Sequence, residues 1–199
     1  MALFEAKKEH FRHSVYLIAD VVDNAASDGG TKVVGINLTR SAESRWSSKP
    51  LAEISNEALT DSQVASLRKA GVTVHVGLGG PVTPRKLSYA VLVTRERYEI
   101  GDPKRLQEEA LALAQRGAPH DAKPELRLFL GTAHWSVDQV LGEIARQSWA
   151  VVPNGATVDD LRGGSPKLWR SLEDAKRLHW APSNPMADEY NQRITQPSS

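Results

Sequence analysis

Residues 129–140 read FLGTAHWSVDQV, and this stretch gives the clearest local structural signal in the chain. Ser136 stands where a hydroxyl accepts a hydrogen bond from a free amide at the start of a helix, and Gln139 follows three residues later to complete a capping box. Trp135 precedes the cap and is spaced to pack on Val140 as a hydrophobic staple. The stretch therefore predicts a helix that begins after Ser136, with Trp135 as a core aromatic.

Apolar runs on either side of this helix start predict two strands. Leu126 to Leu130 is one short apolar run, and Trp149 to Val152 is the other. Between them lies a stripe at helical spacing, formed by Val137, Val140, Leu141 and Ile144. The segment from Leu126 to Val152 thus has the order strand, helix, strand.

The rest of the chain alternates between strand and helix patterns. Asp102 and Pro103 start a helix that ends at Gly117, because aspartate caps a helix and proline fits its first turn. Gly79-Gly80-Pro81 forces a turn, since proline cannot continue a strand ladder. After this turn we expect Lys86–Thr94 to return antiparallel to the strand before it. The other expected strands are His13–Asp20, Thr31–Leu38 and Val72–Leu78, and the other expected helices are Thr60–Ala70 and a last one that carries Leu168, Leu172 and Ala175.

The composition favours a single domain of α/β type and removes several classes of function. The chain has 199 residues, which fits one domain, and no cysteine, which excludes disulfides, thiolate metal sites and a cysteine nucleophile. Its 25 basic and 24 acidic residues nearly cancel, so no overall field attracts nucleic acid. No run approaches 18 apolar residues, so we expect no membrane insertion.

Three sequence patterns, the last of which begins with the stretch described above, follow one another along the chain. They are FRHSVYLI at 11–18 with GINL at 35–38, GGPV at 79–82, and the stretch 129–140 followed by Glu143-Ile144, Trp149 and Leu168-Trp169. Together they resemble the AlgH/YqgE family of bacterial and organellar proteins. The resemblance implies an α+β domain, in which helices pack on a single mixed or largely antiparallel sheet, and implies no established reaction. We assign residues 1–179 to this domain and residues 180–199 to an extended C-terminal arm.

The chain departs from the family inside its most specific motif. It has Thr132, His134, Ser136 and Asp138 in a loop where the family tends to read Gly-Tyr-Ala-Gly-Trp-Gly-x-Gly-Gln. The loss of three glycines implies that any close backbone approach made by the family's loop is changed here. A binding surface around this altered loop is one interpretation, and a purely architectural role is the other.

The candidate binding surface in the domain lies next to these motifs. Its members are His75, Gly79, Gly80, His134 and Trp135. The competing interpretation is that the histidines are hydrogen-bonded structural groups and that Trp135 belongs to the core. A phosphate loop at Gly79-Gly80 is disfavoured, because a proline and a strand follow where a helix would have to begin.

No catalytic, cofactor-binding or metal-binding residue is predicted. His10 and His13 have the spacing of two metal ligands but lack a third. Ser14 and Ser136 have no nucleophile elbow around them. We therefore expect no cofactor and no metal.

The arm carries the strongest signal for a partner. Met186, Tyr190 and Ile194 are spaced four apart in a polar, proline-limited segment, as in a tail that docks on a surface at helical spacing. That surface is either the chain's own domain or a protein partner. RNA is a further possible partner through Lys167, Arg170 and Arg177, although a solvated helix face explains the same residues.

These observations favour a non-catalytic interaction or structural subunit. We expect it to be part of a larger assembly, such as a mitochondrial or ribosome-related particle, and to be located in the mitochondrial matrix or the cytoplasm. One alternative is a small-molecule hydrolase that uses His75 or His134 with an acidic neighbour near the Gly-Gly-Pro turn. The other is a transcription regulator, which the near-neutral charge disfavours.

Overall fold

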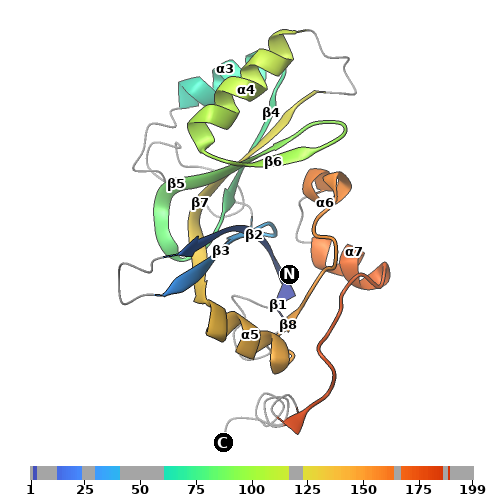
Figure 1. Ribbon diagram of the computed structural model, residues 1–199. Coiled ribbons are helices and arrows are strands. Elements are labelled where there is room, and N and C mark those ends of the chain that lie inside the picture. Colours follow the sequence, from blue (N-terminus) through green and yellow to red (C-terminus); the bar gives the residue numbers. More distant parts are fainter. Residues whose placement is uncertain are drawn as a thin grey trace, which may run out of the picture.

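The computed structural model of the protein describes residues 2–3, 13–23, 30–40, 61–116, 123–163, 167–185 and 188. Its described strands form one mixed eight-stranded sheet with helices packed around it, which confirms the predicted α+β class (Figure 1). The elements are β1 (Ala2–Leu3), β2 (Ser14–Asp23), β3 (Thr31–Asn37), α3 (Asp61–Lys69), β4 (Thr73–Leu78), β5 (Val82–Val93), β6 (Tyr98–Gly101), α4 (Pro103–Gln115), β7 (Glu125–Ser136), α5 (Val137–Ala145), β8 (Trp149–Ala150), α6 (Val158–Gly163) and α7 (Leu168–Asp174).

Strand β7 is the centre of the sheet. Its first half pairs in parallel with β4 along one edge, where Val76 lies opposite Leu128, and antiparallel with β5 along the other edge, where Ala90 lies opposite the same leucine. Its second half pairs antiparallel with β3, where Gly35 lies opposite Ala133. The whole order is β6-β5-β7-β3-β2-β1-β8, with β4 added at β7.

The connection between β4 and β5 crosses β7, because these strands lie on its opposite edges. Gly79 donates its N–H to the carbonyl of Leu130 at 2.8 Å during the crossing. A Cβ atom at Gly79 would lie 2.1 Å from the carbonyl oxygen of Gly131, and one at Gly80 would lie 2.3 Å from the carbonyl carbon of Thr132. The predicted turn is therefore a close crossing of two backbones, and the glycines make this approach possible.

The sheet separates two apolar clusters. Side chains alternate across a strand, so Ala90 and Leu92 of β5 pack towards α3 and α4, whereas Val91 and Val93 pack towards α6 and α7. Figure 1 shows α3 and α4 together at one end of the molecule, with α6 and α7 together beside the sheet. We call these the α3–α4 side and the α6–α7 side.

A third cluster surrounds α5 and confirms the helix start predicted from Ser136. The Ser136 hydroxyl accepts a hydrogen bond from the amide of Gln139 at 3.0 Å. Trp135 is buried and meets Tyr16 and Trp149 edge to face, with ring centroids 5.3 and 5.5 Å away. Aromatic pairs prefer this geometry.

Several details differ from the sequence predictions. Strand β7 does not end at Leu130 but continues to Ser136, because Gly131 adopts a φ of +70° and the strand bends there instead of stopping. The capping box forms only in part, since the carboxamide nitrogen of Gln139 donates to Glu143. Leu141 is 56% exposed rather than part of the apolar stripe.

The strand boundaries also shift. The strand predicted from Lys86 begins at Val82, and although it runs antiparallel to β4, β7 lies between the two. The strand predicted over residues 149–152 is reduced to β8, and Val151 instead forms a bridge with His179. Strand β6 and helix α6 were not predicted; each is only a few residues long.

Candidate functional site

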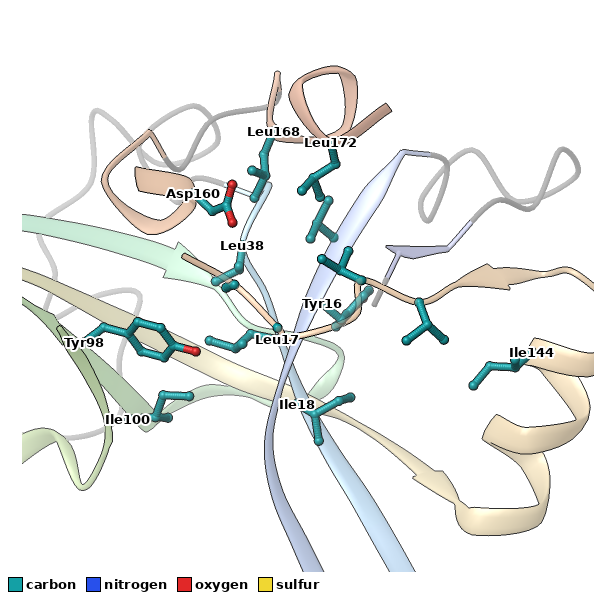
Figure 2. A pocket seen from close by; sticks show the side chains of 15 residues that line it. Tyr16, Leu17, Ile18, Leu38, Tyr98, Ile100, Ile144, Asp160, Leu168 and Leu172 are labelled. Carbon is teal, nitrogen blue, oxygen red and sulfur yellow. The ribbon is translucent and has the colours of Figure 1, made fainter. Parts of the chain in front are cut away.

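A cavity of about 380 Å³ lies between β2, the segment that follows β8, and the helices α6 and α7 (Figure 2). Its mouth is partly open to solvent. The lining is almost wholly aliphatic and aromatic, and among the described lining residues Asp160 alone carries a charge. These residues are Val15, Tyr16, Leu17, Ile18, Leu38, Tyr98, Ile100, Ile144, Val151, Val152, Gly155, Ala156, Asp160, Leu168 and Leu172.

The cavity receives side chains from both faces of β2. Val15 and Leu17 belong to the cluster on the α6–α7 side, whereas Tyr16 and Ile18 belong to the cluster around α5. In Figure 2, Leu168 stands on one side of β2 and Ile144 on the other. The hollow therefore extends around an edge of β2 instead of lying on one face of the sheet.

Asp160 is held by Arg177 in a two-pronged ion pair. Nη1 of Arg177 lies 2.7 Å from Oδ1 of Asp160, and Nη2 lies 2.8 Å from Oδ2. The amide of Thr157 donates to the same carboxylate at 2.7 Å. Burial alone would raise the pKa of Asp160, but the hydrogen bonds from Arg177 and Thr157 outweigh it, so the pKa is lowered. The carboxylate thus stays ionised and already has its partners.

Tyr16 contributes a buried ring to the cavity wall. Burial raises the pKa of its phenol, and this effect exceeds the opposing influence of the Asn37 side chain and of Arg40. The phenol is therefore protonated at neutral pH and is no candidate for a base.

His75 lies at the far end of β7 from the α5 cluster. Its Nε2 atom is 3.6 Å from Oε1 of Glu125, and Nη2 of Arg127 is only 2.5 Å from the same oxygen. Nη2 of Arg127 also donates to the carbonyl of Arg162 at 3.0 Å. The closer arginine charge competes with His75 for this carboxylate.

His134 is separated from His75 along β7. His75 lies opposite Arg127 of β7, and His134 lies seven residues after Arg127 in the same strand. At the usual rise of a strand, seven residues span roughly 20 Å. Nε2 of His134 lies 3.0 Å from the Thr132 hydroxyl. Burial, and secondly the charge of Lys32, lower the pKa of His134. The two predicted histidines therefore do not converge on one pocket.

The other members of the predicted surface belong to the architecture. Gly79 and Gly80 form the backbone crossing, and Trp135 is 7% exposed within the aromatic cluster. Glu143, a candidate acid near His134, instead accepts a hydrogen bond from the indole nitrogen of Trp149 at 2.5 Å.

The predicted partner surfaces are described only in part. Met186, Tyr190 and Ile194 lie outside the described residues. The start of the arm contacts the chain's own domain, since Gln147 donates to the carbonyl of Ala181 at 2.8 Å and Asn184 donates to that of Ala145 at 2.9 Å.

The basic residues proposed for RNA do not form one free group. Arg177 is engaged with Asp160 and also reaches the carbonyl of Gly155 at 3.3 Å. Lys167 and Arg170 are exposed. Of the three, Arg177 is therefore already committed to an ion pair.

The part of the chain that the structure describes holds neither a cluster of metal ligands nor a helix that could span a membrane. Within it, no group of three or more histidine, aspartate or glutamate side chains is placed to hold a metal ion. The helices found there are too short or too polar to cross a bilayer.

Sequence reasoning missed the cavity, although every apolar residue of its wall was visible. The wall is assembled from segments that are far apart in the chain, namely residues 15–18, 38, 98–100, 144–156 and 160–172. The only local signal was the β-branched and apolar run in β2, which predicts a buried strand but not a hollow beside it.

Comparison with known proteins identifies similar sequences and folds. The family described as DUF179, AlgH-like, matches residues 1–179. An X-ray crystal structure of a Corynebacterium diphtheriae protein is similar in fold, with a TM-score of 0.53 at 19% sequence identity, over 92% of this chain and 84% of that chain. No curated protein matches the sequence.

Proposed function

The chain belongs to the AlgH-like family, and on that premise we propose that it is a non-catalytic interaction subunit whose cavity receives an apolar part of a protein partner. The observation that carries the proposal is the apolar cavity of about 380 Å³ beside β2. This volume falls within the range of roughly 300–1,000 Å³ typical of ligand sites.

The wall of the hollow favours an occupant. The mouth is partly open to solvent, and the wall that it exposes is almost wholly apolar. Removing apolar surface from water is favourable, so an apolar occupant would be stabilised there. An apolar side chain buried there would contribute about 1.5–3 kcal/mol, as an anchor residue does at a protein interface.

The chemistry of the wall supports binding rather than catalysis. Asp160 is the charged group among the described lining residues, and Arg177 and Thr157 already bind its carboxylate. Tyr16 keeps its proton at neutral pH. The hydrolase alternative required His75 or His134 in a pocket with an acid, and neither lines this cavity. No observation favours a transcription regulator.

We also propose that the chain is part of a larger assembly, such as a mitochondrial or ribosome-related particle, in the mitochondrial matrix or the cytoplasm. The family resemblance alone supports this part of the proposal. The start of the arm lies near the cavity, because Asn184 bonds to Ala145 and the adjacent Ile144 lines the wall. A partner that fills the cavity therefore has the arm within reach as a second contact.

A cavity-filling variant tests the proposal. Ala156→Phe adds a ring to the wall, and Val21→Phe adds the same side chain to an exposed position of β2. We expect the wild type and Val21→Phe to elute in a large particle when native cell extract is run on size exclusion, and Ala156→Phe to elute free. Elution of the wild type as a free monomer, or of the wild type and both variants in the particle, would contradict the proposal.

A further inference from the structure

The turn that follows β8 contains the one Asn-Gly pair of the sequence, Asn154-Gly155. Both residues are exposed, and both adopt a positive φ, of 66° at Asn154 and 72° at Gly155. The amide of Gly155 donates to the carbonyl of Val152 at 3.2 Å and closes a β-turn with Pro153 at its second position. Asparagine and glycine tolerate the left-handed region that this turn requires.

The reactive groups of this pair are accessible. Within the described part of the chain, no hydrogen bond holds the side chain of Asn154. A Cβ atom built on Gly155 would meet only the Tyr98 hydroxyl, at 4.0 Å, so no other segment crowds the turn. The hydrogen bond that the Gly155 amide makes to Val152 is longer than the usual distance of about 2.9–3.0 Å between nitrogen and oxygen. Exposed turns with so few contacts open at little cost in free energy.

We propose that Asn154 is a site of spontaneous deamidation. The amide nitrogen of Gly155 attacks Cγ of Asn154 and forms a carbon–nitrogen bond, its proton passes to the side-chain nitrogen, and ammonia leaves. The product is a five-membered succinimide ring. Water then opens the ring, to aspartate where the new bond to Cγ breaks and to isoaspartate where the original main-chain bond breaks. No oxidant or reductant takes part, and water is the only co-reactant.

The other described asparagines lack the conditions for this reaction. Glycine favours the ring closure at Asn154, because it has no Cβ atom to hinder the attack. Asn37 is 0% exposed, and its carboxamide oxygen accepts hydrogen bonds from both the amide and the hydroxyl of Thr39. Asn184 precedes Pro185, whose nitrogen carries no hydrogen and cannot close the ring. Among the described asparagines, the structure therefore singles out Asn154.

The modification would alter the cavity, because the turn forms part of its wall. Val152, Gly155 and Ala156 line the cavity, and the carbonyl of Gly155 accepts a hydrogen bond from Arg177 at 3.3 Å. Isoaspartate adds one carbon atom to the main chain between Val152 and Gly155, and either product adds a negative charge to the turn. We therefore expect the modified chain to lose its partner. This consequence rests on the proposed function, whereas the modification itself does not.

Ageing of the full folded chain tests the modification. The wild type is incubated at mildly alkaline pH, because the attack requires loss of the amide proton, and its peptides are followed by mass spectrometry. We expect most of Asn154 to become aspartate and isoaspartate before Asn37 or Asn184 changes detectably, and the conversion to slow at mildly acidic pH. Asn154→Gln is the control. Its longer side chain would have to close a six-membered ring, so this position should stay unmodified.

Two results would overturn the proposed modification. The first is conversion of Asn154 that is no faster than conversion of Asn37 or Asn184 in the same folded sample. The second is conversion of Asn154 in urea but not in the folded chain, which would show that the turn protects the side chain.

The consequence for the partner has its own measurement. Fresh and aged wild type are each added to native cell extract and run on size exclusion. We expect the fresh chain in a large particle and the aged chain free, and we expect Asn154→Gln to stay in the particle after the same incubation. Elution of the aged chain in the particle would overturn the consequence. Elution of the fresh chain as a free monomer would contradict the proposed function, and the conversion of Asn154 is measured independently of it.

Discussion

The same strands contribute apolar side chains to both sides of the sheet, but these side chains pack differently on the two sides. On the α3–α4 side, Leu92, Leu106 and Leu128 are at most 2% exposed, and we call their buried cluster the closed cluster and this side the closed side. On the α6–α7 side, Val91 and Val93 are just as buried, yet their cluster borders the cavity beside β2. Packing quality therefore does not follow from strand composition but from which neighbours the topology supplies.

The difference follows from the elements that cover each side. On the α3–α4 side, the two helices pack on β4, β5 and β7. On the α6–α7 side, the cavity lies between β2, the segment that follows β8 and the helices α6 and α7. The two faces of one sheet are therefore covered differently.

The largest expected effect comes from Gly80, because two backbones cross there in close contact. In Gly80→Val, the new Cβ atom meets the Thr132 backbone at 2.3 Å, and a backbone cannot move aside as a flexible side chain does. We expect a loss of more than about 4 kcal/mol, or failure to fold, in urea denaturation. Gly30→Ala is the control, since it has a φ of +57° but open space around it, and should lose only about 1 kcal/mol. Similar losses in the two variants would show that the crossing is not tight.

The second effect compares one leucine from each side. Leu128→Ala creates a cavity in the closed cluster and should cost about 4 kcal/mol of unfolding free energy, whereas Leu172→Ala enlarges a space that exists and should cost about 2 kcal/mol. Both side chains are at most 2% exposed, so their loss of apolar burial is matched. Equal losses in chemical denaturation would mean that the α6–α7 side is packed as well as the other.

Sequence reasoning predicted the elements of the closed side well, because their signals are local. Asp102 was expected to cap α4, and its carboxylate accepts a hydrogen bond from the Arg105 amide at 2.8 Å. The alternation from Val72 to Leu78 was expected to form a half-buried strand, and Val72, Val74 and Val76 are buried. Caps and alternation depend only on neighbours in the chain.

The cavity could not be predicted in the same way, because it depends on segments that are distant in the chain. It requires Leu17 of β2 to lie near Leu168 and Leu172 of α7, and no local pattern encodes that arrangement. The pair of Asp160 and Arg177 likewise joins residues 17 positions apart, and the basic pattern around Arg177 suggested an exposed face instead. A choice of candidate residues by their chemical type therefore overlooked a cavity that is built mainly from apolar side chains.

The third effect concerns the ion pair between Asp160 and Arg177 at the wall of the cavity. Asp160→Asn should lower stability by roughly 2 kcal/mol at pH 7, since Arg177 loses its charged partner. The folded pKa of Asp160 is lowered, so the contribution is present above the unfolded pKa of about 3.9 and is lost as the pH falls through the lower folded value. Thermal unfolding of the two proteins should therefore converge at low pH.

The neighbouring exposed carboxylate is the matched control for that experiment. Asp159→Asn changes the adjacent residue of α6 and should leave stability within about 0.5 kcal/mol of the wild type at every pH. A difference between Asp160→Asn and the wild type that persists unchanged at low pH would show that the ion pair is not its source.

The smallest expected effect comes from filling the cavity beside β2, and it tests the comparison most directly. Ala156→Phe places a ring in existing space, so we expect its unfolding free energy to stay within about 1 kcal/mol of the wild type. Ala110→Phe forces the same ring into the closed cluster, where Ala110 is 0% exposed, and overpacking there should cost about 1–3 kcal/mol or more. Chemical denaturation of both variants measures the two unfolding free energies that are compared. If Ala156→Phe is as damaging as Ala110→Phe, the α6–α7 side holds no usable space, and the loss of a partner in that variant would reflect unfolding instead of a blocked site.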